Sequence, residues 1–355
     1  MKDFPVTAKR SLELLGLFLL GYIILVASNI IMPLLLAFFL SMLLLPVHRF
    51  LIRKKVPTSL SIIGPILILL IIAAGLIWFF SAQIQLLVDD FPQIKKNINT
   101  HLNSLSQWIS GFTHFSTKQQ VEFINEQSDK LLNSTGAILG SVLGSVSGAF
   151  IFFGLLPIYI YLILAYKNLL LKFCIMWFSD GDLPNVKASI KQIESIIQSY
   201  LMGLLIQIAY ITVLLGGILW IIGIKHALLI GVLFAILNLI PYIGALFGNI
   251  LGVMLTVSSS QELWPIFTVL IVIAVVQFLD NNILMPRIVG SKVQINSLVA
   301  IVGIVIAGSL AGISGMFLAL PIIAVLKIAF DRTKDFKKWG VLIGTDVPEE
   351  NPLRE

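Results

Sequence analysis

The stretch QFLDNNILMPRIVGSK, residues 277–292, concentrates polar side chains at the end of a long apolar segment. Asp280 is its only carboxylate, and Gln277, Asn281 and Asn282 lie within about two helical turns of it. A carboxylate inside an apolar helix is costly in lipid unless water, an ion or a partner compensates its charge. Asp280 could therefore carry a proton or coordinate a cation.

A structural interpretation of Asp280 is equally open. Arg287 follows seven residues later, which places the two side chains near one face of a helix, where they could form an ion pair. Pro286 ends the segment, so the Arg287 guanidinium could instead bind an anionic or hydroxylated ligand, or anchor the helix among head groups. Residue types and spacing leave these roles undecided.

The composition is that of an integral membrane protein. Hydrophobic residues make up 58% of the chain and charged residues 12%, against about 25% charged in soluble domains. Lipid does not satisfy bare backbone groups, so we predict an all-α polytopic membrane fold in the lipid bilayer. Four stretches, each of roughly 20 residues or more, are long enough to cross as helices: 59–82, 136–166, 201–222 and 263–285.

Three further apolar stretches are predicted to be helical hairpins, either re-entrant or pairs of short spans. Basic residues favour cytoplasmic flanks, and most of the 24 Lys and Arg fall in the N-terminus, 46–58, 167–199, 286–295 and the tail. With these regions and both termini in the cytoplasm, the remaining apolar stretches must return to the side they enter from. They are 11–45, with Asn29 and Pro33 near its turn, 227–257 and 296–330.

The second and third of these stretches carry residues that interrupt helices. In LNLIPYIGALFGN the turn is predicted at Pro241, Gly244 and Gly248, with Asn238 and Tyr242 as polar neighbours, and in AGSLAGISGMFLALP at Gly312 and Gly315, with Pro321 closing it. One hairpin would enter from outside and the other from inside. Such inverted pairs of broken helices are typical of secondary transporters. Alternatively, glycine and proline here only allow close helix packing.

Five segments follow from this organisation. We predict an N-terminal hairpin with a basic loop at 1–58, a span with an external amphipathic helix at 59–135, a span with a cytoplasmic amphipathic helix at 136–200, a transport core of two spans and two hairpins at 201–330, and a cytoplasmic tail at 331–355. A stripe of small residues for helix packing begins the third segment: Gly136, Gly140, Gly144 and Gly148.

Other chemistry is thin, so we predict that the chain is no enzyme. It contains no G-x-x-x-x-G-K-[ST] phosphate loop and no H-E-x-x-H zinc helix, and its four histidines lack ligand spacing. The single cysteine excludes an intramolecular disulfide. We expect no metal centre and no cofactor. The net charge of +6 is explained by cytoplasmic flanks and requires no nucleic-acid partner.

The motifs LNLIPYIGALFG, DNNILMPRIVG and AGISGMFLALP together resemble the autoinducer-2 exporter family of bacterial membrane transporters. The resemblance covers nearly the whole chain, with departures at Ala245 and Ser297, where the family often has proline. It implies export of an autoinducer-2-like solute or exchange of Na⁺ or Li⁺ for H⁺, a location in the bacterial cytoplasmic membrane, and a homo-oligomer, a pentamer, whose protomers move in an elevator-like way.

Two function classes are open at this point. The first is a secondary transporter or exporter that moves a small polar solute or a monovalent cation in exchange for protons by alternating access. The second is a non-transporting oligomeric membrane scaffold or pore, in which the hairpins would be static. The sequence names neither the substrate, the coupling ion, the direction nor the size of the oligomer.

Overall fold

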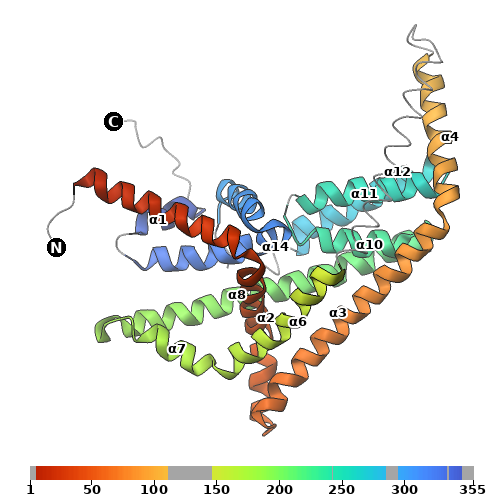
Figure 1. Ribbon diagram of the computed structural model, residues 1–355. Helices are drawn as coiled ribbons and strands as arrows, with labels where there is room; N and C mark the ends of the chain where they lie inside the picture. Colours follow the sequence, from red (N-terminus) through yellow and green to blue (C-terminus); the bar gives the residue numbers. More distant parts are fainter. Residues whose placement is uncertain (1–4, 111–145, 242, 285–294, 334–335, 346–355) are drawn as a thin grey trace. The chain divides into compact units, whose positions relative to one another are not determined.

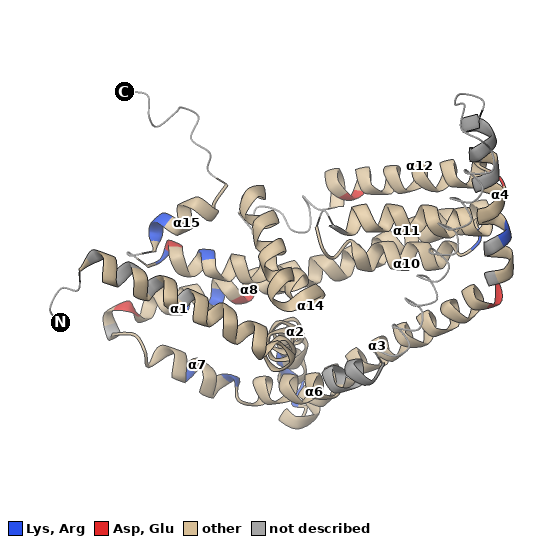
Figure 2. Ribbon diagram, turned by 45° about the horizontal axis from the view of Figure 1, so that its top comes forward, with Lys and Arg blue, Asp and Glu red and all other residues tan. Residues whose placement is uncertain are grey.

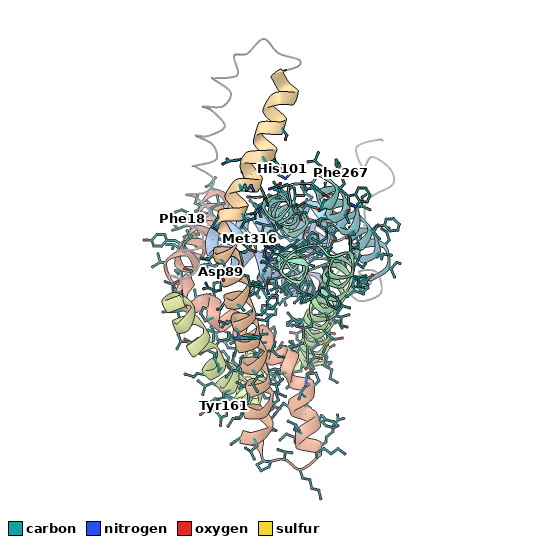
Figure 3. All side chains as sticks on the ribbon, turned by 90° about the vertical axis from the view of Figure 1, so that its right-hand side faces the viewer. Phe18, Asp89, His101, Tyr161, Phe267 and Met316 are labelled. Carbon is teal, nitrogen blue, oxygen red and sulfur yellow. The ribbon has the colours of Figure 1, made fainter. Side chains whose placement is uncertain are left out.

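The computed structural model describes residues 5–110, 146–241, 243–284, 295–333 and 336–345, and the regular secondary structure within these ranges is entirely helical (Figure 1). Five helices in the described ranges are long and apolar enough to cross a membrane, or six if one bent pair forms a single span. The prediction of an all-helical, multi-pass membrane protein is confirmed. Large apolar side chains project outward, for example Phe18 and Phe267, which are 71% and 56% exposed (Figure 3).

The chain divides into two compact units. One contains residues 1–67, 151–202 and 288–355, and the other contains 68–150 and 203–287. The boundaries fall inside helices α3 (Thr58–Asp89), α6 (Val146–Ala165) and α8 (Leu183–Ile211). The predicted segment 201–330 is therefore shared between the units.

The first unit begins with α1 (Val6–Val26) and α2 (Ser28–Arg53), which are separated by a break at Ala27. The turn therefore lies two residues before Asn29, while Asn29 and Pro33 belong to the first turns of α2. The two helices diverge from the break instead of lying alongside each other (Figures 1 and 2). At 26 residues, α2 alone is long enough to be a candidate span, which differs from the predicted hairpin over 11–45.

The first unit continues through α6, α7 (Lys167–Ile175), the short η1 (Asp180–Asp182) and the start of α8. The amphipathic segment predicted before residue 200 is not a separate helix, because α8 runs unbroken from Leu183 to Ile211. Of the predicted small-residue stripe, only Gly148 falls in a described helix, α6, whereas Gly136, Gly140 and Gly144 lie outside the described residues.

Helix α14 (Ser297–Asp331) folds back on itself, although its 35 residues are continuous in the chain. Ala311 and Gly312 leave the helical conformation, and Gly312 adopts φ 60° and ψ −147°, a region that only glycine enters easily. The two arms lie against each other, because a Cβ atom added to Gly303 would collide with Ile323 and one added to Gly315 with the carbonyl of Ala307. The turn of this hairpin at 296–330 was predicted at Gly312 and Gly315, with Pro321 closing it. The break includes Gly312, whereas Gly315 and Pro321 lie within the second arm.

The base of this α14 hairpin is tied to the C-terminal helix α15 (Lys337–Ile343) and to α8. The Asn296 side chain caps α14 by accepting from Val299 N–H at 2.9 Å, and its amide donates to the carbonyls of Leu342 and Gly344 at 2.6 and 2.9 Å. On the other arm, Arg332 donates to Gln192 of α8 at 2.7 Å.

The second unit contains a bundle that follows the end of α8. Its elements are η2 (Thr212–Gly216), α9 (Gly217–Ile222), α10 (Ala227–Leu237), α11 (Ile243–Ser259), α12 (Trp264–Leu279) and η3 (Asp280–Leu284). Figures 1 and 2 show α10, α11 and α12 side by side. Their buried core includes Ile211, Leu215, Phe234, Ile273 and Val276.

Helices α10 and α11 form the hairpin predicted at 227–257. The chain reverses between Asn238 and Ile243, and Pro241 lies in this turn. Gly244 packs against the backbone of Leu237, and Gly248 packs against the ring of Phe234, so closely that a Cβ atom at either position would overlap its neighbour. Both glycines therefore permit the two arms to touch.

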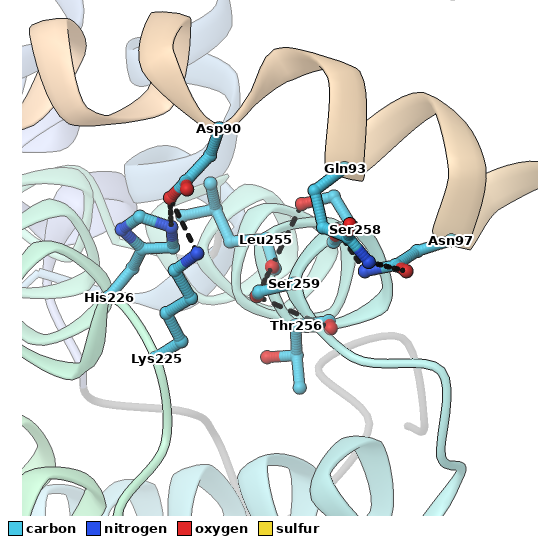
Figure 4. Close-up of polar contacts among 9 residues, drawn as sticks. All are labelled: Asp90, Gln93, Asn97, Lys225, His226, Leu255, Thr256, Ser258 and Ser259. Atoms are coloured by element: carbon cyan, nitrogen blue, oxygen red, sulfur yellow. Dashed lines mark hydrogen bonds and ion pairs between the residues drawn. The ribbon is translucent and has the colours of Figure 1, made fainter.

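Helix α4 (Phe91–Ser110), predicted as an external amphipathic helix, is fastened to this hairpin by polar contacts (Figure 4). Asp90 precedes it and lies 2.7 Å from Lys225 Nζ and 3.3 Å from His226 Nε2. Asn97, which is 1% exposed, donates to the Ser258 carbonyl at 2.9 Å. The contacts reach both ends of the α10–α11 hairpin, the start of α10 and the end of α11.

Candidate functional site

Asp280 is the first residue of η3, directly after α12, and is only 1% exposed. The preceding α12 is apolar except for Thr268 and Gln277, and it supplies Val269, Ile273 and Val276 to the buried core. Ile273 and Val276 face the bundle. Gln277 and Asp280 each lie four residues after one of them, so they share the inward face of the helix. The Asp280 carboxylate therefore lies in the interior of the second unit.

Amide groups from two other elements meet this carboxylate. The Oδ2 atom of Asp280 accepts from Gln207 Nε2 of α8 at 2.7 Å and from Asn238 Nδ2 at 3.1 Å. Gln277 Nε2 donates in turn to Asn238 Oδ1 at 3.4 Å. Gln207 is 4% exposed, and Asn238 is the residue that ends α10 at the turn of the hairpin. We call Asp280, Gln207, Asn238 and Gln277 the Asp280 cluster.

Two buried oxygens of this cluster have no hydrogen-bond partner among the residues that the structure describes. They are Asp280 Oδ1 and Gln277 Oε1. The described ion pairs likewise contain none with Asp280. Burying an ionised carboxylate costs several kcal/mol, and a hydrogen bond to a charged group returns about 1.5–3 kcal/mol. Two amide donors on one oxygen leave the other oxygen open to a proton or a cation.

Both π-helical turns of the described chain belong to the elements that build this cluster. Thr212 begins η2, five residues after Gln207, and Asp280 begins η3. A π-turn inserts one residue into an α-helix and shifts the register of the side chains that follow, and such turns are frequent at functional sites. The buried hydroxyl of Thr212 also has no hydrogen-bond partner in the described part of the chain.

The structure brings together three of the residues predicted for the site, namely Asp280, Gln277 and Asn238. It does not bring Asn281 and Asn282 to them: both are exposed, and the Asn282 amide donates to the Phe278 carbonyl of its own helix at 2.8 Å. Tyr242, Pro286 and Arg287 lie outside the described residues. The alternative of an Asp280–Arg287 pair therefore stays a prediction.

Gln207 is a member of the cluster that the sequence interpretation missed. It stands in the apolar run of residues 201–222 that was predicted as a plain span. The available signal was its chemistry, because an amide side chain inside a membrane helix normally faces a polar partner. Its partner lies 73 residues away in the chain, so only the tertiary fold identifies it.

The chemistry of the Asp280 cluster favours a small, singly charged ligand. Its open groups are one carboxylate oxygen and one amide oxygen, which are hard oxygen donors. Among the described residues no group of three or more His, Cys, Asp or Glu could hold a metal ion. A proton or a monovalent cation matches one carboxylate, whereas a divalent cation would leave uncompensated positive charge.

Comparison with known proteins agrees with a membrane carrier. A family model described as "AI-2E family transporter" matches residues 14–335. The "Putative transport protein YrrI" of Bacillus subtilis (strain 168) is 26% identical over 313 residues, which cover 86% of this chain and 86% of that protein. The "AI-2 transport protein TqsA" of Escherichia coli (strain K12) is 26% identical over 324 residues, 89% and 90% of the two chains. The matched range contains the Asp280 cluster and both hairpins.

Proposed function

The chain belongs to the AI-2E family of transporters, and on that premise we propose that it is a secondary transporter in which Asp280 binds the coupling ion. It moves a small polar solute or a monovalent cation in exchange for protons by alternating access. The TqsA relative is named an AI-2 transport protein, which supports an autoinducer-2-like solute as a candidate substrate.

One observation carries this proposal: the buried Oδ1 atom of Asp280 has no hydrogen-bond partner among the described residues. Oδ2 already accepts two hydrogen bonds, so a proton or cation that binds at Oδ1 would stabilise the buried carboxylate. A static scaffold would gain nothing from such a group, since an apolar residue at the same position would pack without a desolvation cost. Transport requires a group that is stable only with its ion bound.

The position of Asn238 suggests how ion binding is coupled to movement. Asn238 lies at the turn of the α10–α11 hairpin, whereas Asp280 and Gln277 lie at the end of α12. Any shift of the hairpin turn relative to α12 lengthens the 3.1 Å bond between Asn238 and Asp280. Occupation of Asp280 and the position of the hairpin therefore influence each other, as alternating access demands.

The test is transport by purified protein in proteoliposomes, with Asp280→Asn as the informative variant. Asparagine keeps the size and removes the charge, so we expect ion-coupled flux of Na⁺, Li⁺ or H⁺ to be lost while expression and melting temperature are retained. Thr268→Val is the matched control, because Thr268 is half-buried on the same helix, outside the Asp280 cluster, and its hydroxyl donates to the Trp264 carbonyl. Coupled flux that persists in Asp280→Asn would remove Asp280 from the site.

The same assay separates the transporter from the scaffold or pore. A carrier moves an ion only in exchange for, or together with, its second substrate, and the flux saturates. If the parent protein moves neither ions nor small hydroxylated solutes, or conducts them without coupling, the proposal is wrong.

A further inference from the structure

Helix α7 leaves the span that precedes it at a sharp angle. The axis of residues 154–165 in α6 and the axis of Lys167–Ile175 differ by 63°, and the break lies at Tyr166. Figure 1 shows α7 turning away from α6 at this point. With nine residues, α7 is about 14 Å long, which is too short to cross the hydrocarbon of a bilayer.

None of the residues in α7 is buried, although most are apolar. Leu169, Phe173 and Trp177 recur every four residues and are 60%, 57% and 75% exposed. The rings of Phe173 and Trp177 meet edge to face at 5.9 Å, so these side chains form one continuous stripe along the helix and the turn after it. We call it the α7 stripe.

The two lysines of α7 border the stripe, one on each side. At about 100° per residue, Lys172 lies about 60° from Leu169 and Lys167 about 80° from Trp177 around the helix axis. Asn168, Leu171 and Ile175 lie between the two lysines, and α7 contains no acidic residue. Figure 2 shows only basic residues in colour on this helix. In the described part of the chain neither lysine forms an ion pair.

Glu194, the carboxylate that interacts electrostatically with Lys167, is already engaged. The carboxylate of Glu194 in α8 accepts hydrogen bonds from both terminal guanidinium nitrogens of Arg49, one of them at 3.1 Å. This bidentate ion pair matches one carboxylate to one cation. Lys167 therefore stands as a surplus positive charge beside Arg49, at the end of a membrane span, next to an apolar stripe.

We propose that α7 lies along the membrane surface at the end of α6, with the α7 stripe in the outer acyl-chain region and Lys167 and Lys172 bound to anionic lipid head groups. A short helix with an exposed apolar and aromatic stripe that is bordered by lysines is typical of an interfacial helix. Amphipathic rings such as that of Trp177 are enriched at this depth. The charge of the two lysines selects an anionic over a zwitterionic lipid.

The depth of the stripe is tested with an environment-sensitive label on the full-length protein in vesicles. In a Cys174→Ser background, which removes the chain's single cysteine, Trp177→Cys carries the label on the stripe and Asn168→Cys carries it on the opposite side. We expect nitroxide-labelled lipids to quench the first label strongly and the second weakly. Equal quenching, or a label at 177 that is shielded from water yet not quenched by lipid, would overturn the proposal in favour of solvent or a protein partner.

The lipid charge is tested by adding phosphatidylglycerol to the parent protein and to a Lys167→Gln, Lys172→Gln double variant. Each lysine near an anionic surface contributes about fivefold in affinity, so the double variant should bind phosphatidylglycerol roughly 25-fold more weakly. The matched control is Lys187→Gln with Lys191→Gln, which removes the same charge from exposed positions on α8. A double variant at α7 that binds no more weakly than this control contradicts the role of the lysines. Phosphatidylcholine should not distinguish any of the proteins.

Discussion

The two oxygens of Asp280 have different surroundings, and this difference makes the residue functionally informative. Oδ2 accepts from Gln207 and Asn238, while Oδ1 is buried without a partner among the described side chains. Among the described residues, the donors to this carboxylate are two neutral amides. Neutral donors hold the group in position without satisfying its charge. In the proposed transporter, the coupling ion compensates this charge when it binds.

Replacing Gln207 by leucine should weaken the cluster without unfolding the chain. The variant removes the 2.7 Å bond to Oδ2, which as a hydrogen bond to a charged group stabilises the ionised form by about 1.5–3 kcal/mol. We expect affinity for a monovalent cation to fall roughly 10-fold to 100-fold, while proton binding becomes easier. Measurement of half-saturating Na⁺ and Li⁺ in proteoliposomes gives the result, with Thr268→Val as the control. An unchanged cation affinity would mean that Gln207 only packs.

How far the cluster could be predicted depends on helix geometry. Gln277 shares a face with Asp280 because it is three residues away, whereas Asn281 and Asn282, one and two residues on, necessarily point elsewhere. Helix geometry alone was therefore sufficient to exclude Asn281 and Asn282 from the predicted site. Gln207 required knowledge of which face of α8 meets α12, and that is decided by packing between segments distant in sequence.

Gly312 provides a second test at a single position. Its φ of 60° and ψ of −147° are strained for any residue with a side chain, so Gly312→Ala should lower the free energy of unfolding by roughly 1–3 kcal/mol. Gly154→Ala is the matched control, since Gly154 is helical, exposed and without a neighbour within 4 Å of an added Cβ atom. Melting temperatures in detergent should fall for the first variant and stay or rise for the second. Equal values would contradict the strained tip.

Among the helices, the hairpin breaks were predictable and the N-terminal arrangement was not. Glycine and proline mark the turns after Asn238 and at Gly312 because only such residues permit the required backbone and the close contact of the arms. Asn29 and Pro33 indicated a turn close to the break at Ala27, but not the direction that α1 takes from it. The path of α1 is decided by its contacts with α2 and α14, which no local pattern reveals.

The attachment of α4 to the α10–α11 hairpin should weaken in acid. Burial and the charge of Lys225 lower the pKa of His226, while the hydrogen bond and charge of Lys225 hold the pKa of Asp90 below its ordinary value. Both groups bind protons less readily in the folded protein. These groups contribute fully to the stability of the folded protein at a pH above their pKa in the unfolded chain, which is about 6.5 for histidine. The contribution is lost as the pH falls through their lowered pKa in the folded protein.

His226→Asn is the variant that tests this pH dependence. The position has φ 59°, which asparagine tolerates better than most residues, so the change removes the titrating ring with little backbone strain. We expect the fall in melting temperature between about pH 7.5 and pH 5.5 to be smaller in His226→Asn than in the parent protein. A fall of the same size in both would assign the acid sensitivity to other groups.

At the scale of the whole molecule, the two units cut across the transport core predicted from the sequence. The α10–α11 hairpin and the Asp280 cluster belong to the unit of residues 68–150 and 203–287, and the α14 hairpin belongs to the other. The hydropathy pattern predicts spans and hairpins in their order along the chain, and it therefore favoured one contiguous transport core at 201–330. Compact units follow packing instead, and α14 packs with α15, α2 and α1 of its own unit. Each unit therefore contains one of the two hairpins, and their inverted arrangement stays a prediction.

The inverted pair itself predicts on which side of the membrane each hairpin has its ends. If the α10–α11 hairpin enters from outside, both of its ends must be accessible there. If the α14 hairpin enters from inside, both of its ends must be cytoplasmic.

In the Cys174→Ser background, Lys225→Cys and Ser260→Cys report on the first hairpin, and Ile295→Cys and Thr333→Cys report on the second. We expect an impermeant maleimide to label the first pair only in right-side-out vesicles and the second pair only in inside-out vesicles. If the two ends of one hairpin react from opposite sides, that segment crosses the membrane instead of returning to the side it enters from. The chain would then lack the two opposed hairpins on which the proposed alternating-access carrier depends.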